Sequence, residues 1–142
     1  MRFTRRRTYT MKILIVEDEA LIAMSIEAVL EDNGYDVVEI ADDEASALLA
    51  AARHNPELAL VDMRLAGGDC GLSVAQKLNA MGVAVVFATG NCPGAAIENL
   101  AIGCLHKPLS DDQIVVGLSV ADAKRRGVVN PPPPPPGMHL FD

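Results

Sequence analysis

The chain has 142 residues, enough for one domain with a sizeable hydrophobic core and too few for two such domains. Half of the residues are hydrophobic and 22% are charged, which is typical of a soluble globular protein. The sequence contains no apolar run of membrane-spanning length and no signal-peptide pattern. We therefore expect no membrane partner.

The net charge of −7 is distributed unevenly along the chain. Five basic residues and no acid fall within residues 1–12, so the remainder carries −12. Such an acidic globular part is a poor nonspecific nucleic-acid binder, and we expect no direct contact with nucleic acid. Residues 1–10 are predicted to form a basic, disordered arm, or to precede a working start at Met11. An electrostatic arm for an acidic partner is the alternative.

The chain contains three cysteines, Cys70, Cys92 and Cys104, and none of them belongs to a CxxC motif. Their odd number and the absence of that motif argue against a disulfide framework and against a zinc site. A reducing, cytoplasmic location is the natural expectation. Cys104 is predicted to be a small core residue rather than a redox sensor.

Short apolar runs bounded by turn residues or acids predict strands that are buried on both faces of a sheet. Five such runs occur, at residues 11–16, 36–40, 58–62, 83–87 and 102–105. Hydrophobic residues at helical spacing follow each of them and predict helices around residues 22–30, 45–52, 74–81, 96–100 and 110–121. The helix around residues 96–100 has the weakest pattern.

Three helix boundaries carry specific signals. Gly34 is suited to a left-handed cap after the first helix. The second helix is expected to end by Asn55, because Pro56 disfavours helical backbone in the residue before it. Ser110 and Gln113 have the spacing of a capping box at the start of the last helix.

Five consecutive βα units predict an α/β fold, a doubly wound parallel sheet with helices on both faces, over residues 11–126. Right-handed crossovers leave few topologies, and we expect the flavodoxin-like (βα)5 strand order 2-1-3-4-5. In that order the first and third strands are neighbours at the switch point. Ligands bind outside the carboxyl ends of the strands at such a point.

This topology predicts that acidic residues from two strand ends meet. Glu17 and Asp18 follow the first strand and Asp62 ends the third. Two charges about 4 Å apart cost roughly 4 kcal/mol at an effective dielectric near 20, so three carboxylates require a proton or a cation. An oxygen-only cluster with room for water suits Mg2+.

Two further residues are expected at the same rim, Thr89 after the fourth strand and Lys107 after the fifth. A carboxylate such as Asp62 can act as a nucleophile toward phosphorus and form an aspartyl phosphate. A metal ion and Lys107 would then neutralise the developing charge, while Thr89 would offer a hydroxyl to a phosphoryl oxygen.

Five features in order along the chain resemble the signature of a response-regulator receiver domain: Glu17-Asp18, Asp62, Thr89, Lys107 and Pro108. The resemblance runs from about Met11 to Arg126. It implies that Asp62 is the phosphoacceptor and that Thr89 and Lys107 bind the phosphoryl group.

The same resemblance implies a magnesium site. Asp18 would bind Mg2+ directly, together with Asp62, and Glu17 would bind it through water. The backbone carbonyl of Arg64 would supply another ligand.

The run Phe87-Ala88-Thr89-Gly90 further resembles a stand-alone receiver subfamily that works with histidine kinases of the HWE type. The implied function is that of a single-domain response regulator. It would accept a phosphoryl group from a sensor histidine kinase or phosphotransfer protein and signal by phosphorylation-dependent partner binding. Its only catalysis would be its own phosphorylation and dephosphorylation. A homodimer would use the face formed by the last two helices and the strand between them.

The sequence departs from the family pattern in several places, including Asn91-Cys92 after the subfamily motif and a short segment between Thr89 and Lys107. Ala66 stands where many receivers have proline, and Cys104 stands where many have an aromatic residue three positions before the lysine. An alternative function is a receiver-fold interaction module that is not phosphorylated; the missing aromatic residue argues mildly for it, whereas the complete set of acids argues against it. A flavodoxin-like redox or nucleotide protein is disfavoured, because the chain lacks a phosphate-binding glycine loop.

Residues 127–142 form a proline-rich tail with six consecutive prolines, Pro131 to Pro136. Such a run adopts an extended polyproline helix of about 3.1 Å per residue. We expect a stiff, solvated tail, with docking in a partner's aromatic groove as the alternative.

Overall fold

The computed structural model describes residues 10–92 and 99–141. Within this part of the chain, one sheet contains the strands β1 (Lys12–Val16), β2 (Asp36–Ala41), β3 (Leu58–Asp62), β4 (Ala84–Thr89), β5 (Gly103–His106) and β6 (Met138–Leu140). The helices described are α1 (Ala20–Asp32), α2 (Glu44–His54), α3 (Gly71–Ala80) and α4 (Asp111–Arg125), with a short 3-10 turn, η1 (Ala66–Gly68).

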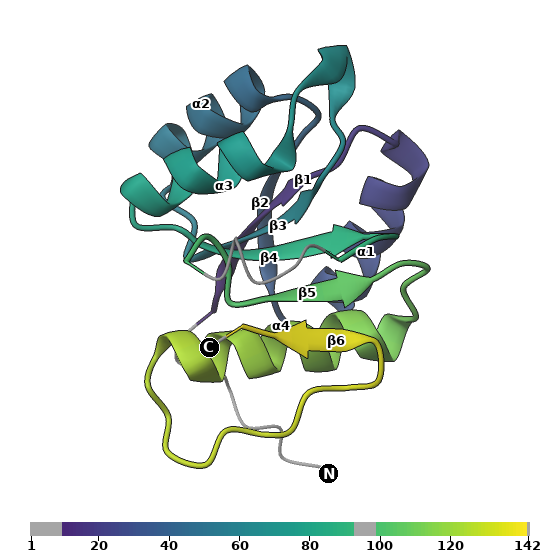
Figure 1. The fold of residues 1–142 in the computed structure, drawn as a ribbon, viewed down its shortest axis with the longest axis vertical. Coiled ribbons are helices and arrows are strands. Elements are labelled where there is room, and N and C mark those ends of the chain that lie inside the picture. The colour runs from purple at the N-terminus through teal and green to yellow at the C-terminus, as the bar shows by residue number, and fades with distance from the viewer. Residues whose placement is uncertain (1–9, 93–98, 142) are drawn as a thin grey trace, which may run out of the picture.

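The strands lie in the order β2-β1-β3-β4-β5-β6 (Figure 1). The first five are parallel, so the flavodoxin-like order 2-1-3-4-5 is confirmed. Leu58 of β3 pairs with Ile13 of β1 on one side and with Ala84 of β4 on the other. The carboxyl ends of β1, β3, β4 and β5 therefore share one rim of the sheet.

Two hydrophobic layers cover the faces of the sheet. Helices α2 and α3 pack on one face, where Ala47, Ala51 and Leu78 contact strand residues of the first core cluster. Helices α1 and α4 pack on the other, where Ile26 and Leu118 belong to the second cluster (Figure 1). Burial on both faces explains why the central strands are continuous apolar runs rather than alternating ones.

The predicted helix boundaries agree with the structure. Gly34 has a φ of 87° directly after α1, and Asn55 caps α2 in the left-handed conformation. Ser110 and Gln113 form the capping box of α4. The helix predicted around residues 96–100 falls largely on residues 93–98, which lie outside the described part of the chain.

The prediction that the tail is solvated throughout is wrong for its last residues. Most of the proline run is exposed, but β6 pairs antiparallel with β5 along the sheet edge (Figure 1). Phe141 is 6% exposed and joins the first core cluster. Gly103 permits the pairing, because a Cβ there would lie 2.6 Å from the His139 carbonyl oxygen.

The cysteine pattern argues against a disulfide framework, but the structure contains a disulfide. Cys92 and Cys104 form a disulfide, whereas Cys70 is free and exposed. The two bonded residues are 12 positions apart, and the turn after β4 brings their Cα atoms to 6.0 Å. Cys104 is fully buried, as expected for a core residue.

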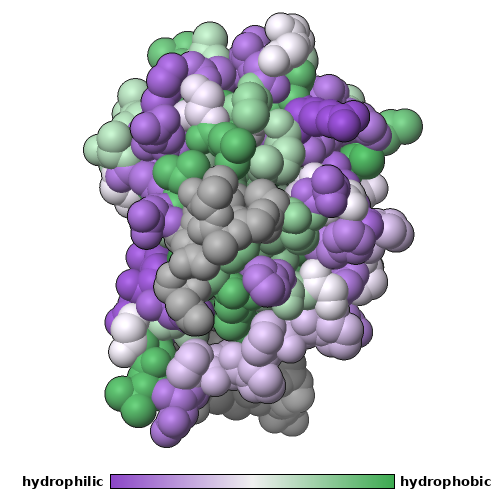
Figure 2. All heavy atoms as spheres, in the orientation of Figure 1, coloured by the Kyte–Doolittle hydropathy of each residue, from purple (hydrophilic) through white to green (hydrophobic). Residues whose placement is uncertain are grey.

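Hydrophilic side chains are spread over the face of the molecule seen in Figure 2, with hydrophobic side chains interspersed. Among the described residues, the large hydrophobic side chains that are at least half exposed are Leu21, Met24, Leu49 and Val129. None of the helices within residues 10–92 and 99–141 has the length and apolar character that a transmembrane span requires.

Replacing Phe141 with alanine is expected to lower the free energy of unfolding by about 3 kcal/mol, the lower end of the range for a buried phenylalanine. Urea denaturation followed by circular dichroism measures the change. Val129→Ala is the matched control in the same tail, because Val129 is 83% exposed. Equal stabilities of the two variants would contradict the docking of the tail on the sheet.

Candidate functional site

Three carboxylates converge at the rim of the sheet. Glu17 and Asp18 directly follow β1, and Asp62 is the last residue of β3, the strand beside it. One oxygen from each of the three side chains lies within 4.8 Å of the others. The predicted meeting of these acids is therefore present in the structure.

Lys107 reaches the carboxylates from the end of β5. Its Nζ atom donates hydrogen bonds to Oε1 of Glu17 at 2.7 Å and to Oδ2 of Asp62 at 3.1 Å. The Glu17 side chain is 3% exposed, that of Asp62 14% and that of Lys107 21%. The ammonium group thus neutralises part of the acidic cluster where these three side chains are largely buried, and an ion pair is stronger there than at the surface.

The environment shifts the ionisation of two of these groups. Burial, together with the neighbouring Asp62, raises the pKa of Glu17 to about 7, although the hydrogen bond from Lys107 opposes the shift. Burial alone would lower the pKa of Lys107, but its bonds to Glu17 and Asp62 raise it. Lys107 is therefore a permanent cation, while Glu17 exchanges a proton near neutral pH.

The loop after β3 holds the Asp62 carboxylate in place. The Arg64 amide donates to Oδ1 of Asp62 at 3.3 Å, and the Gly71 amide donates to the Met63 carbonyl at 2.8 Å. A Cβ at Gly71 would overlap the Asp62 carbonyl oxygen and approach the Met63 Cα to 2.8 Å. Only glycine lets the start of α3 pack this closely on the strand end. The role of the Arg64 backbone carbonyl as a magnesium ligand stays a prediction.

Thr89 is the last residue of β4 and is 8% exposed. It lies one position beyond Ala88, the register partner of Asp62. Its Oγ1 accepts a hydrogen bond from the Asn91 amide at 3.3 Å, and its carbonyl accepts one from the Lys107 amide at 2.9 Å. The backbone thus links Thr89 to Lys107, and both lie on the rim that carries the carboxylates. The bond between Lys107 and Pro108 is cis.

The donor set fits Mg2+. The cluster offers carboxylate oxygens alone, the ligands that this hard cation prefers, and Asp18 is exposed, so water can complete the coordination. No sulfur or imidazole belongs to it. The sequence did not predict how deeply Glu17 is buried or that it pairs directly with Lys107; a carboxylate immediately after a buried strand was the available signal.

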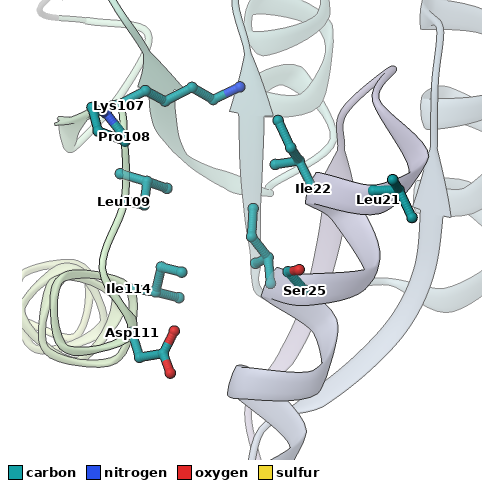
Figure 3. Close-up of a pocket in the computed structure, with 9 residues that line it drawn as sticks. Leu21, Ile22, Ser25, Lys107, Pro108, Leu109, Asp111 and Ile114 are labelled. Atoms are coloured by element: carbon teal, nitrogen blue, oxygen red, sulfur yellow. The ribbon is translucent and has the colours of Figure 1, made fainter.

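A groove beside the site was also missed by the sequence analysis. It has a volume of about 340 Å³ and lies between α1 and the segment that leads from Lys107 into α4. Figure 3 shows Leu109 and Ile114 on one side of it and Ile22 and Ser25 on the other. Helical spacing predicted Ile22 and Ile114 as core residues, and both indeed pack in the second core cluster.

Solved structures with the same fold include receiver domains. The signal receiver domain of a modulated diguanylate cyclase from Desulfovibrio desulfuricans G20 has 29% identity and a TM-score of 0.73, covering 83% of this chain and 98% of that one. The receiver domain of the PhyR response regulator of Erythrobacter litoralis has 25% identity and a TM-score of 0.66, with coverages of 87% and 95%.

Curated relatives are longer than this chain. The transcriptional regulatory protein PdtaR of Mycobacterium tuberculosis is 28% identical over 122 residues, 82% of this chain and 59% of PdtaR. The phyllosphere-induced regulator PhyR of Methylorubrum extorquens is 41% identical over 80 residues, 55% of this chain and 30% of PhyR. Residues 13–119 match the response regulator receiver domain family, to which this chain therefore belongs.

Proposed function

We propose that this chain is a phosphorylation-controlled signalling domain in which Asp62 accepts a phosphoryl group from a phosphohistidine. One observation supports this most directly. Lys107 bonds to both Asp62 and Glu17, residues 45 and 90 positions away in the sequence, and so assembles a nucleophile, a cation and a pair of metal-binding carboxylates at one rim.

In this reaction an oxygen of Asp62 attacks phosphorus. A P–O bond forms as the P–N bond to histidine breaks, and the histidine nitrogen keeps the electron pair and takes a proton. Lys107 stays within reach of the transferred group and offsets its charge, while the Thr89 hydroxyl, whose oxygen accepts from the Asn91 amide, donates its proton to a phosphoryl oxygen. The Arg64 amide keeps the attacking carboxylate oriented.

Receiver domains commonly bind Mg2+ at an acidic pocket, and the described residues contain such a cluster. Asp18, Asp62 and, through water, Glu17 would hold the ion, with the Arg64 carbonyl as a further ligand. When bound, Mg2+ supplies positive charge to the phosphoryl oxygens. Before that, Lys107 and a proton on Glu17 limit repulsion among the carboxylates.

The phosphoryl donor would come from a sensor histidine kinase or phosphotransfer protein, because receiver domains interact with histidine kinases. The groove beside Lys107, the residue that bonds to Asp62, offers such a partner an apolar docking surface (Figure 3). Leu21 and Met24 of α1 are 81% and 57% exposed and extend this apolar surface. A helix of the partner that carries the phosphohistidine would pack there.

The run from Phe87 to Gly90 supports membership of the subfamily served by HWE-type kinases. The chain spans only 30% of the Methylorubrum PhyR, so the activities of that whole protein do not transfer to it. We further propose that this domain acts alone in the cytoplasm. It would signal by binding a partner when it is phosphorylated.

Incubation with a small acyl phosphate and Mg2+ is expected to add one phosphoryl group to the wild-type chain. Asp62→Ala removes the nucleophile and should abolish the gain, as measured by intact mass spectrometry. Asp36→Ala is the matched control, because Asp36 begins β2 at the opposite end of the sheet. A wild-type protein that gains no mass would favour the alternative of a constitutive interaction module.

Magnesium affinity is expected to depend on pH through Glu17. The pKa of Glu17 is about 7, so at lower pH this carboxyl holds a proton that magnesium binding must displace. The magnesium affinity should therefore rise about tenfold per pH unit below pH 7 and level off above it. Glu17→Gln should bind more weakly and lose the pH dependence, whereas Glu31→Gln, on the exposed side of α1, should keep it. Isothermal titration calorimetry tests this, and a flat wild-type profile from pH 6 to 8 would contradict it.

Leu21→Arg is expected to slow phosphotransfer from an autophosphorylated HWE-type kinase core by about tenfold, the effect of losing an interface anchor of moderate strength. Phosphorylation by the small acyl phosphate should stay unchanged, because the site is intact. Leu49→Arg is the control, since Leu49 is 59% exposed on α2, across the sheet. If Leu21→Arg and Leu49→Arg behave alike, the groove is not the docking surface.

A further inference from the structure

The disulfide lies between two segments of the proposed phosphorylation site. Cys92 follows Thr89 by three residues, and Cys104 precedes Lys107 by three residues. We propose that Cys92 and Cys104 form a redox modification site, opened and closed by thiol–disulfide exchange with a low-molecular-weight thiol and its disulfide. The bridge then controls whether the segment after Thr89 is tied to β5.

The two sulfur atoms differ in access. Cys104 is 0% exposed and belongs to the same core cluster as Phe87 and Phe141. Cys92 is only partly buried, and it lines an open hollow of about 360 Å³ together with His106, Gly137, Met138 and His139. A small thiol in this hollow reaches the sulfur of Cys92 and not that of Cys104.

This difference sets the order of the exchange. A thiolate attacks Sγ of Cys92, the bond to Cys104 breaks, and Sγ of Cys104 leaves with the electron pair and takes a proton. A second thiolate attacks the small-molecule sulfur of the mixed disulfide and releases Cys92. Two small thiols are thereby oxidised to one disulfide as the protein pair gains two electrons and two protons. The reverse sequence closes the bridge.

The rest of the fold gives no reason for a purely structural bridge. The domain buries two extensive hydrophobic clusters, so it does not belong with the small domains that need disulfides to fold. In reducing compartments, disulfides that do form are usually transient or redox-sensing. The third cysteine, Cys70, is exposed and unpaired, so its thiol would react alongside the bridge and is replaced by serine in the experiment.

The bridge acts on Thr89 through Asn91, whose amide donates to the Thr89 hydroxyl. While Cys92 is bonded to β5, Asn91 is held where its amide fixes the position of the Thr89 hydroxyl oxygen. Opening the bridge frees Asn91 to move and lets the hydroxyl rotate so that it can donate to a phosphoryl oxygen. This consequence, unlike the redox chemistry itself, rests on the proposed function.

Redox titration tests the site directly. In a Cys70→Ser background, the protein is equilibrated with mixtures of reduced and oxidised glutathione, blocked with iodoacetamide and mapped by mass spectrometry. Cys92 and Cys104 should gain and lose alkylation together and reversibly. During brief exposure to reduced glutathione, the mixed disulfide should appear on Cys92 alone.

Single variants test the order of attack. Cys104→Ser should accumulate glutathione on Cys92, whereas Cys92→Ser should accumulate none on Cys104 until denaturant is added. A bridge that never forms, or one that resists glutathione under native conditions, would overturn the proposal. Attack on Cys104 in the wild-type chain would also overturn it, and that measurement does not depend on either variant folding.

A second arm measures the coupling to Thr89. Phosphorylation by a small acyl phosphate with Mg2+ is expected to be about fivefold faster in the reduced protein, at the lower end of typical coupling between sites. The double variant Cys92→Ser/Cys104→Ser should show no redox effect. Equal rates in both wild-type forms would overturn the coupling. If neither the reduced nor the oxidised protein is phosphorylated, the proposed function is contradicted instead. The redox site is then tested by the alkylation mapping alone.

Discussion

The arrangement of the site depends on a single ammonium group held between two carboxylates. Lys107 bonds to Glu17 and Asp62, while a third carboxylate, Asp18, lies within the same cluster. Without this cation, three acids at such distances would repel one another strongly. Loss of one partner from a largely buried ion pair is costly, because the remaining charge stays uncompensated. The contact therefore ties the ends of β1, β3 and β5 together.

Much of this arrangement could be predicted from the sequence because it follows from burial. Parallel strands covered on both faces must be apolar throughout, so acids such as Asp62 stand out at their ends. The crossover rules then place those ends side by side. The depth at which Glu17 is buried and its direct contact with Lys107 could not be predicted, because they depend on side-chain directions at the rim.

Two features escaped prediction for a different reason. Cys92 lies beyond the end of β4, and its distance to Cys104 is set by the path of a turn that no periodicity encodes. The return of the chain after the prolines is likewise a tertiary effect. A signal was present, since Met138, Leu140 and Phe141 supply apolar side chains after a long polar and proline-rich stretch. Those residues gain burial only once the sheet edge exists.

The position of β6 has a consequence for self-association. The outer side of β5 is already hydrogen-bonded to β6 (Figure 1). The edge strand on this side of the sheet is therefore β6, which is just three residues long. So short an edge strand is a poor template for a strand of another molecule. Short edge strands are one of the ways in which proteins avoid edge-to-edge aggregation. Copies of this chain that pair along this edge would first have to displace β6, whereas the opposite edge of the sheet is formed by β2.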